Sequence, residues 1–299
     1  MNYLYYPGCS LKCSGRGYEE SLLPVFEALG ASLEELPDWN CCGATAYMSV
    51  DQHAAYGLAL RNLALAERRA GAGEAPVDLV APCAACYLVL HRAQHYITEY
   101  PEFGRQMAER LKIAGLRYTG RVRVRHPLDV LVNEIGLGRI RSRVRRPLTG
   151  LKAVCYYGCQ IVRPYALFDD QDRPTSMDLL MSALGAEPLD WPLKTRCCGG
   201  SLTGTIPDVG LRLNELLLNE ARSRGAQAVV TACPLCQFNL ECKEGGSPRR
   251  RGEGEHLQIV YFTQLAGVAF GIPERKLGLQ RSLVPFRCDL VAPEGASHA

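Results

Sequence analysis

The pattern of apolar and polar positions repeats along the chain. Short apolar runs that end near a cysteine predict strands, and apolar residues spaced by three or four predict amphipathic helices. The predicted strands are residues 3–6, 32–36 and 77–81 in the first half and residues 151–156, 187–191 and 228–232 in the second half. The predicted helices are residues 18–29 and 51–70 in the first half and residues 177–184 and 208–224 in the second half.

This alternation of strands and helices predicts the fold class. Each half reads strand, helix, strand, helix, strand and a further helix, an order typical of α/β proteins with parallel strands. The first helix of each half ends at a Gly-Ala pair, Gly30-Ala31 and Gly185-Ala186, which is a common helix C-terminal signal. We therefore expect two similar halves with Rossmann-like layers, residues 1–150 and residues 151–299.

Composition narrows the class of protein. The chain has 299 residues and a formal net charge of +3, so its charge gives no reason to expect nucleic acid as a partner. The sequence from Met1 lacks the basic start and apolar run of a signal peptide, and no apolar stretch reaches the length of a transmembrane helix. We expect a cytoplasmic protein, or one held at a membrane only through partner subunits.

Cysteine is the unusual component. The chain has 14 cysteines, and a reducing cytoplasm disfavours seven disulfides, so metal binding is the better explanation. Ten of them form two copies of one pattern: a single cysteine, a Cys-Cys-Gly element and a Cys-x-x-Cys element. The copies are Cys9, Cys41-Cys42-Gly43 and Cys83-x-x-Cys86, then Cys155, Cys197-Cys198-Gly199 and Cys233-x-x-Cys236.

The predicted fold brings the five cysteines of each copy together. Every cysteine element follows a predicted strand, and loops after parallel strands meet at the carboxyl edge of the sheet, where open α/β folds bind ligands. The Cys-x-x-Cys elements also open a predicted helix, whose N-terminus favours thiolates.

Three kinds of chemistry use clustered cysteines. A structural zinc site takes four ligands, commonly from two close pairs, but Cys86 and Cys233 are far apart in the sequence and each group has five cysteines. Redox-active thiols or disulfides would explain a single Cys-x-x-Cys and leave three cysteines of each group without a role. Iron–sulfur chemistry uses soft thiolates and accommodates many of them, so we favour it.

The sequence resembles the B-type chain of heterodisulfide reductase and its bacterial relatives over nearly the whole of its length. The resemblance rests on the Tyr-Pro-Gly-Cys-Ser-Leu segment that ends at Leu11, on both Cys-Cys-Gly and both Cys-x-x-Cys elements, on the Cys-Tyr-Tyr-Gly-Cys segment that ends at Cys159, and on the Tyr-Phe-Thr-Gln-Leu segment that ends at Leu265. Ahead of Cys83 the first half has extra residues, in the predicted loop 70–76, which we expect to leave the ligands unchanged.

The resemblance implies two non-cubane [4Fe-4S] clusters, each bound by five cysteines. Carried over by position, the expected ligands are Cys9, Cys41, Cys42, Cys83 and Cys86 for the first cluster and Cys155, Cys197, Cys198, Cys233 and Cys236 for the second. It also implies that a disulfide, thiol or sulfane-sulfur substrate reacts between the clusters, with Cys197 and Cys198 acting catalytically through the second one. The other four cysteines are Cys13, Cys159, Cys242 and Cys288, of which Cys159 lies near an expected ligand and Cys13 is spaced from Cys9 as Cys159 is from Cys155.

The sequence carries no nucleotide or flavin signature, so electrons must pass through other subunits. The resemblance implies a heterodisulfide reductase A-like flavoprotein, a C-like iron–sulfur subunit and, in bacterial sulfur oxidation, a lipoyl-carrier protein as partners. Sulfur oxidation is favoured over methanogenesis by an arginine-rich composition with only six lysines. The alternative is an electron-transfer or quinone-docking subunit of a succinate dehydrogenase or of a lactate or glycolate oxidation complex.

Overall fold

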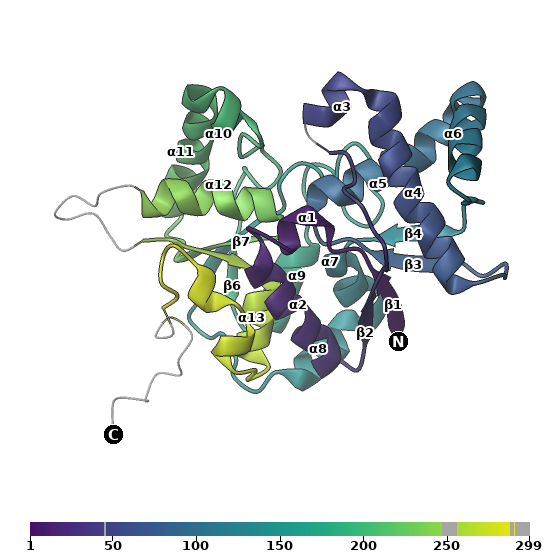
Figure 1. Cartoon of the computed structure of the whole chain (residues 1–299). Coiled ribbons are helices and arrows are strands. Elements are labelled where there is room, and N and C mark those ends of the chain that lie inside the picture. Colours follow the sequence, from purple (N-terminus) through teal and green to yellow (C-terminus); the bar gives the residue numbers. More distant parts are fainter. Residues whose placement is uncertain (45, 247–255, 288–289, 291–299) are drawn as a thin grey trace. The chain divides into compact units, whose positions relative to one another are not determined.

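The computed structural model describes residues 1–44, 46–246, 256–287 and 290. It contains two parallel four-stranded sheets, one for each repeat (Figure 1). The strands are β1 (Asn2–Tyr5), β2 (Ser32–Glu35), β3 (Val77–Val80), β4 (Val122–Arg125), β5 (Lys152–Tyr156), β6 (Glu187–Leu189), β7 (Ala228–Thr231) and β8 (Gln258–Tyr261). The predicted α/β class, with parallel strands and two repeated halves, is confirmed.

The helices fall between these strands at corresponding places in the two repeats. The helices of the first repeat are α1 (Gly8–Leu11), α2 (Arg16–Ala28), α3 (Ala46–Val50), α4 (Gln52–Ala70), α5 (Ala84–Glu99), α6 (Pro101–Ile113), α7 (Pro127–Asp129), the π-helical η1 (Val130–Gly136) and α8 (Leu137–Arg143). Those of the second repeat are α9 (Ser176–Ala183), α10 (Leu202–Thr205), α11 (Pro207–Ser223), α12 (Pro234–Gly245), α13 (Phe262–Ala269) and the short η2 (Glu274–Lys276) and η3 (Leu279–Arg281). Among the described residues, no helix is both long enough and apolar enough to cross a membrane.

Both sheets have the same strand order. The first is β2-β1-β3-β4 and the second is β6-β5-β7-β8, with all neighbours parallel. The chain moves outward on one side from β1 to β2 and then crosses to β3 on the other side. This reversal creates a crevice at the carboxyl ends of β1 and β3, and of β5 and β7, which is where such sheets bind ligands.

The fourth strand of each sheet, β4 and β8, is absent from the sequence-based expectations. In β4 the residues alternate as Val-Arg-Val-Arg, a pattern that indicates a strand but lies in a stretch with many arginines. In β8 all four residues are buried, because the strand lies beside β7 beneath α12 and α13. A short, fully buried strand has no alternation by which it can be recognised.

The chain packs into two compact units. The first contains Met1–Cys9 and Ala31–Pro127, and the second contains Ser10–Gly30 and Leu128–Ala299. The boundary predicted at residue 150 remains a prediction about the sequence repeat. By packing, α2 and α8, which come from the first repeat in sequence, belong to the unit of the second sheet.

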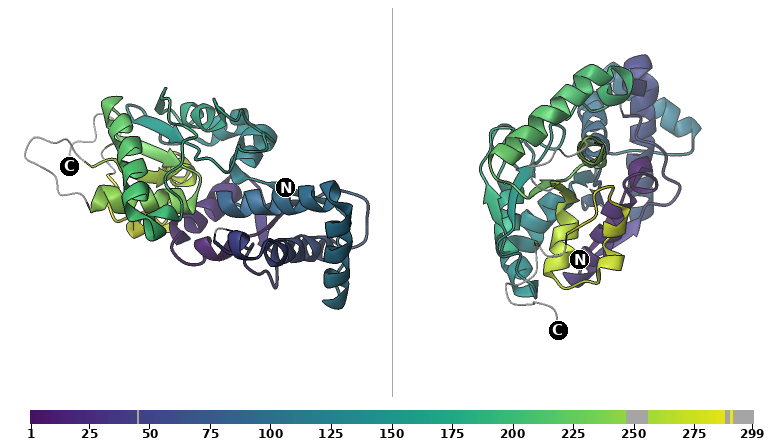
Figure 2. Two further views of the ribbon diagram at one scale, coloured as in Figure 1. Left: turned by 90° about the horizontal axis from the view of Figure 1, so that it is seen from above. Right: turned by 90° about the vertical axis from the view of Figure 1, so that its left-hand side faces the viewer.

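These two transferred helices contact matching partners in the second unit. Helix α2 packs against α13, and α8 packs against α9 (Figures 1 and 2). The rings of Tyr18 and Tyr261 stack with centroids 4.4 Å apart, and Ser21 Oγ and Thr263 Oγ1 lie 2.6 Å apart in the same buried layer. The first helix of each repeat thus pairs with the helix that follows the last strand of the other repeat.

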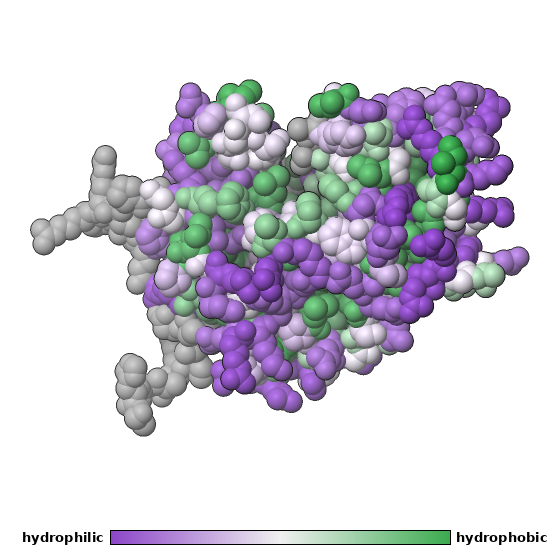
Figure 3. All heavy atoms as spheres, viewed as in Figure 1, coloured by the Kyte–Doolittle hydropathy of each residue, from purple (hydrophilic) through white to green (hydrophobic). Residues whose placement is uncertain are grey.

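Each unit has its own apolar core. In the first unit the core lies between the sheet and helices α4 and α5, and includes Tyr5, Leu63 and Leu79. In the second unit it includes Val154 and Val229, between the sheet and the surrounding helices. The face drawn in Figure 3 carries its hydrophobic side chains in separate groups among hydrophilic ones.

Candidate metal centres

The first group of cysteines lies at the carboxyl ends of strands in the first unit. Cys9 follows β1, and Cys83 and Cys86 follow β3, so these three come from the two strands that flank the crevice. Cys83 is the N-cap of α5 and has no side-chain capping bond of its own. Its thiol is therefore available at a helix N-terminus, where backbone N–H groups favour a negative charge.

The loop after β2 brings the Cys-Cys-Gly element to the same place. The Sγ atoms of Cys42 and Cys86 are 3.3 Å apart, and the Gly43 N–H donates to Cys41 Sγ at 3.5 Å. The charges of Cys9 and Cys42 act on the Cys41 thiol, and Cys83 acts on Cys86. The five cysteines predicted for the first group thus lie within one electrostatic neighbourhood.

The second unit repeats this arrangement. Cys198 Sγ and Cys236 Sγ are 3.5 Å apart, and the Gly199 N–H donates to Cys197 Sγ at 3.3 Å. Asn239, one turn after Cys236 on α12, donates to Cys198 Sγ at 3.6 Å. Cys233 is the N-cap of α12 and acts on both Cys198 and Cys236.

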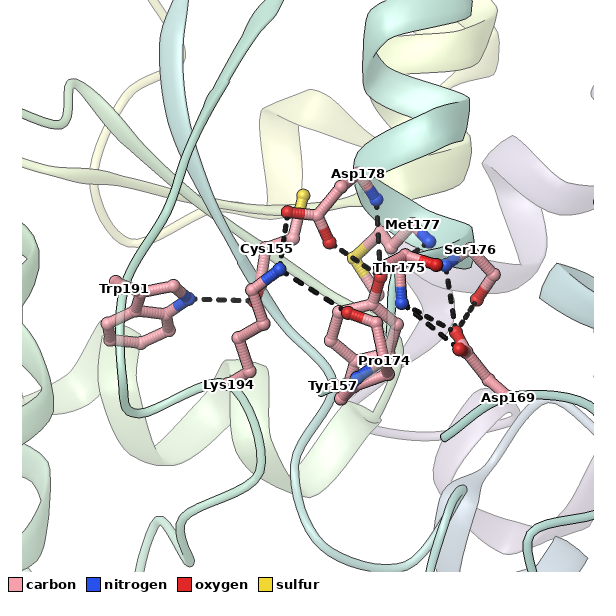
Figure 4. Close-up of polar contacts among 10 residues, drawn as sticks. All are labelled: Cys155, Tyr157, Asp169, Pro174, Thr175, Ser176, Met177, Asp178, Trp191 and Lys194. Carbon is pink, nitrogen blue, oxygen red and sulfur yellow. Dashed lines mark hydrogen bonds and ion pairs between the residues drawn. The ribbon is translucent and has the colours of Figure 1, made fainter. Parts of the chain in front are cut away.

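The structure does not bring Cys155 into the second group, and it places Cys159 there instead. Cys159 shares a hydrogen bond with Cys197, and the charges of Cys198 and Cys233 also act on its thiol. Cys155 lies within β5, is fully buried, and has Asp178 and Lys194 as its charged neighbours (Figure 4). A side chain inside the strand points into the layer between sheet and helix α9, so it does not reach the loops at the sheet edge.

A Tyr-x-Gly-Cys element is the sequence signal that marks Cys159. It occurs as Tyr6-Pro7-Gly8-Cys9 and as Tyr156-Tyr157-Gly158-Cys159, so Cys159 is the counterpart of Cys9. The similar spacing of Cys9 to Cys13 and Cys155 to Cys159 favours a different alignment, shifted by four residues. Cys13 is exposed, and none of the cysteines of the first group is among its described hydrogen-bond partners.

The tyrosine of this element holds the next cysteine loop in both units. The Tyr6 hydroxyl donates to the main-chain oxygen of Asn40 at 2.8 Å, and the Tyr156 hydroxyl donates to that of Arg196 at 2.6 Å. Asn40 and Arg196 each come directly before the Cys-Cys-Gly element. Burial, followed by the nearby cysteine charges, raises the pKa of both tyrosines well above the usual value, so both hydroxyls stay protonated and keep donating.

Glycine in these elements allows close approach. A Cβ on Gly8 would lie 2.9 Å from Cys86 Sγ, and a Cβ on Gly158 would lie 3.1 Å from Cys236 Sγ. Gly199 has φ 93°, and a Cβ there would lie 2.9 Å from the Cα of Gly210 on α11. The absent side chains leave space beside the sulfur atoms.

The thiols in each group divide into proton donors and proton acceptors. Hydrogen bonds from Cys41 and Cys86 lower the pKa of Cys42 to about 4, whereas the bond to Cys42 and burial raise the pKa of Cys86. In the second group, a hydrogen bond from Cys159 lowers the pKa of Cys197 to about 6. Each group therefore holds at least one thiolate at neutral pH, and the thiolate is the form that binds metals.

These residues fit an iron–sulfur cluster better than a single metal ion. Two thiolates on one tetrahedral metal lie about 3.8 Å apart, given metal–sulfur bonds of roughly 2.3 Å. The pairs at 3.3 and 3.5 Å are near this separation. Among the described residues, however, no three or more Cys, His, Asp or Glu side chains are arranged around one ion. Sulfur atoms spread around a larger centre suit a group with several irons, which accepts soft thiolates.

Two cysteines remain outside both groups. Cys242 is half-buried on α12, and burial followed by the Glu241 charge raises its pKa. Cys288 lies outside the residues that the structure describes. Neither adds to the candidate centres.

The comparisons with known proteins agree with the repeat. The family model "CCG: Cysteine-rich domain" matches the chain twice, at residues 3–91 and 153–241. Each match spans one set of three strands and one group of cysteines.

Several curated relatives match most of the chain. The 8-methylmenaquinol:fumarate reductase membrane anchor subunit of Wolinella succinogenes is 29% identical over 94% of this chain and 96% of its own length. A protein of Archaeoglobus profundus that is named as like the B-type chain of heterodisulfide reductase is 29% identical over 93% of this chain and 94% of its own length. The B-type chain of the ferredoxin/F(420)H(2)-dependent CoB-CoM heterodisulfide reductase of Methanosarcina acetivorans is 27% identical over 93% of this chain and 92% of its own length.

One solved structure shares the fold. It is described as a hypothetical protein from Helicobacter pylori, and it matches 95% of this chain and 52% of its own chain with a TM-score of 0.72 and 15% identity. At this identity the likeness concerns the fold alone.

Proposed function

Because the chain belongs to the cysteine-rich CCG domain family, with two copies of the domain, we propose that each copy binds one iron–sulfur cluster through five cysteines. The proposed ligands are Cys9, Cys41, Cys42, Cys83 and Cys86 for the first cluster and Cys159, Cys197, Cys198, Cys233 and Cys236 for the second. Cys159 replaces Cys155 in this set, because the structure places Cys159 beside Cys197. The observation that carries the proposal is the matched arrangement of the two groups of sulfur atoms.

The proposed clusters are of the non-cubane [4Fe-4S] type. Support comes from the five thiols in each group and from the adjacent cysteines, which can bind neighbouring irons of one cluster. When bound, such a cluster supplies electrons and an iron atom to which a substrate sulfur can attach. The protein supplies binding, orientation and the surrounding charges.

The chain's own residues make one side of each site accessible. Cys41 and Cys197 are exposed, whereas Cys42 and Cys198 are buried. A substrate would therefore approach the outer cysteine of each Cys-Cys pair, while the inner cysteine stays shielded from water. In the second unit, Asn239 also holds Cys198 through its amide.

We propose an oxidoreductase reaction at a sulfur group. A disulfide takes up two electrons and two protons and yields two thiols, and the same reaction run in reverse oxidises thiols. The names of the relatives from Archaeoglobus and Methanosarcina support this chemistry, with Cys197 and Cys198 acting through the second cluster. The arginine-rich composition favours the oxidative direction in bacterial sulfur metabolism, with a lipoyl-carrier protein delivering the sulfur.

A multi-subunit complex is part of the proposal. The relatives named above are subunits, and this chain has no flavin or nucleotide signature. We propose a heterodisulfide reductase A-like flavoprotein and a C-like iron–sulfur protein as partners.

A second candidate function is electron transfer to or from a quinone. The relative from Wolinella succinogenes, a membrane anchor subunit of an 8-methylmenaquinol:fumarate reductase, favours it. In that case the clusters would relay electrons and would not react with a substrate sulfur.

One experiment separates the two functions. The complex is purified anaerobically by a tag on this chain, its subunits are identified, and the rate of reduced-viologen oxidation is measured with an added disulfide and with an added menaquinone. Disulfide-dependent oxidation that Cys198→Ala abolishes supports the sulfur reaction. Quinone-dependent oxidation without any response to disulfides, together with a co-purifying fumarate or succinate flavoprotein, would contradict it.

A further inference from the structure

The loop in front of each Cys-Cys-Gly element is held in place differently in the two units. In both, a tyrosine hydroxyl bonds the residue directly before the element. The remaining contacts come from different elements, and they involve different residue types. This difference points to residues that position the two sites separately.

In the second unit the loop is held by Lys194, three residues before Cys197. The main-chain oxygen of Lys194 accepts the N–H groups of Tyr157 at 3.0 Å and of Gly158 at 3.2 Å. These two residues come directly before Cys159. One carbonyl group therefore joins the segment of Cys159 to the loop of Cys197.

The side chain of Lys194 fixes the position of that carbonyl group. Its Nζ lies 2.8 Å from Asp178 Oδ1 and donates to the Pro174 oxygen at 3.3 Å (Figure 4). The ion pair is largely buried, with side-chain exposures of 12% for Lys194 and 16% for Asp178. A buried pair of this kind is costly to break, because the remaining charge is left without a counter-charge.

Tyr157 joins the same network to the start of helix α9. Its hydroxyl donates to Asp178 Oδ2 at 2.7 Å and accepts the Met177 N–H at 2.7 Å. Asp169 accepts the N–H groups of Thr175 and Ser176 beside it. The N-terminus of α9 is thus capped by residues from outside the helix, and it provides a fixed point for Lys194.

In the first unit the loop is held by α4. Arg61 donates to the main-chain oxygen of Asp38 at 2.7 Å, to Asp38 Oδ2 at 2.6 Å and to Asn40 Oδ1 at 2.9 Å. Asn62 accepts the Asn40 N–H at 2.9 Å and donates to the Asn40 oxygen at 2.9 Å. Asn40 comes directly before Cys41.

Neither network has a counterpart in the other unit. Counted back from Cys9, from Gly30 and from Cys41, the positions of Tyr157, Asp178 and Lys194 are occupied in the first repeat by Pro7, Leu23 and Asp38. On α11 the positions facing the loop carry Leu216 and Leu217 where α4 has Arg61 and Asn62, when Gly210 and Ala55 are aligned by their contacts with the Cys-Cys-Gly glycines.

We propose that Lys194, with Asp178 and Tyr157, is the positioning residue of the second cysteine group, and that Arg61 has the same role for the first group. Each network sets the position of the exposed cysteine of its own pair, Cys197 or Cys41, without acting on the other site. The inference rests on the proposed function where it concerns bound clusters, but the positions of the thiols can be tested without them.

The test is an exchange of effects between two variants, Lys194→Met and Arg61→Met. In the metal-free full chain, the rates at which iodoacetamide alkylates Cys197 and Cys41 are measured by mass spectrometry. We expect Lys194→Met to change the rate at Cys197 by about fivefold and to leave Cys41 unchanged, because a lost hydrogen bond of about 1 kcal/mol corresponds to that factor. Arg61→Met is expected to do the reverse, and Lys194→Arg to restore the wild-type rate at Cys197.

A second measurement on the iron-loaded chain uses the EPR spectrum. The signal that Cys159→Ala removes identifies the second cluster. Lys194→Met should alter the shape of that signal alone, and Arg61→Met should alter only the other signal. Asp178→Asn, which keeps the volume of the side chain, serves if Lys194→Met does not fold.

The outcomes separate the two proposals. Equal changes at Cys41 and Cys197 in both variants, or no change in either, would overturn the positioning role. A wild-type chain that binds no iron would overturn the proposed function, while the alkylation rates would still decide whether Lys194 and Arg61 position the thiols.

Discussion

The Tyr156 hydroxyl donates a hydrogen bond of 2.6 Å to the main-chain oxygen of Arg196, directly before Cys197. Tyr156→Phe removes the donor and leaves a carbonyl group without it in a buried site. We expect the free energy of unfolding to fall by about 1–3 kcal/mol, measured by urea denaturation of the metal-free chain. Tyr47→Phe, at an exposed side chain, is the control and should change it by less than about 0.5 kcal/mol. Equal stability of Tyr156→Phe and wild type would mean that this bond does not hold the loop.

Cys155 and Cys159 should behave in opposite ways when each is replaced by alanine. Cys159→Ala removes a proposed ligand, so the chain should lose about half of its iron. Cys155→Ala should keep its iron and lose roughly 1–2 kcal/mol of stability through the small cavity it creates in the core of β5. Iron and acid-labile sulfide are measured per chain for both. Loss of iron in Cys155→Ala with full iron in Cys159→Ala would restore the assignment made from spacing alone.

Gly199 should not tolerate a side chain. Gly199→Ala forces a residue with a Cβ to adopt φ 93° and places that atom 2.9 Å from the Gly210 Cα. We expect a loss of at least about 1–3 kcal/mol, seen as a lower midpoint in thermal unfolding. The matched control is Gly138→Ala on α8, where a Cβ meets no atom within 4 Å and helix propensity favours alanine. If both variants unfold at the same temperature, the close approach at Gly199 has no energetic consequence.

Glu241 should make stability depend on pH. It is buried on α12, and burial raises the pKa of its carboxyl group above the usual value. A raised folded-state pKa means that its contribution to stability is fully present below the unfolded-state pKa, about 4.3, and is lost as the pH rises through the folded-state value. The difference in free energy of unfolding between wild type and Glu241→Gln should therefore shift against wild type from about pH 4 upward. A difference that stays constant over this range would show that Glu241 titrates normally.

The sequence was sufficient for the repeat and for most of both cysteine groups. Each strand that leads into a cysteine element was recognisable, because an apolar run ended at a Cys, Gly or Pro position. Strands β4 and β8 were not recognisable, since four residues with either an arginine-rich alternation or complete burial do not stand out from their surroundings.

Two other features needed the structure. The amphipathic pattern of α2 shows that one face is buried, but it does not show that this face packs against α13, more than two hundred residues away in the chain. Spacing placed Cys155 in the second group, whereas the direction of its side chain from β5 takes it into the protein core. Cysteine spacing alone does not distinguish a residue at the end of a strand from one inside it.

The central claim is that the two groups of five cysteines each bind an iron–sulfur cluster. The most direct test is the iron and acid-labile sulfide content of the anaerobically purified full chain, together with its zinc content. The proposal predicts about eight irons and about eight sulfides per chain, with little zinc. Stoichiometric zinc without iron, in a folded chain, would contradict it.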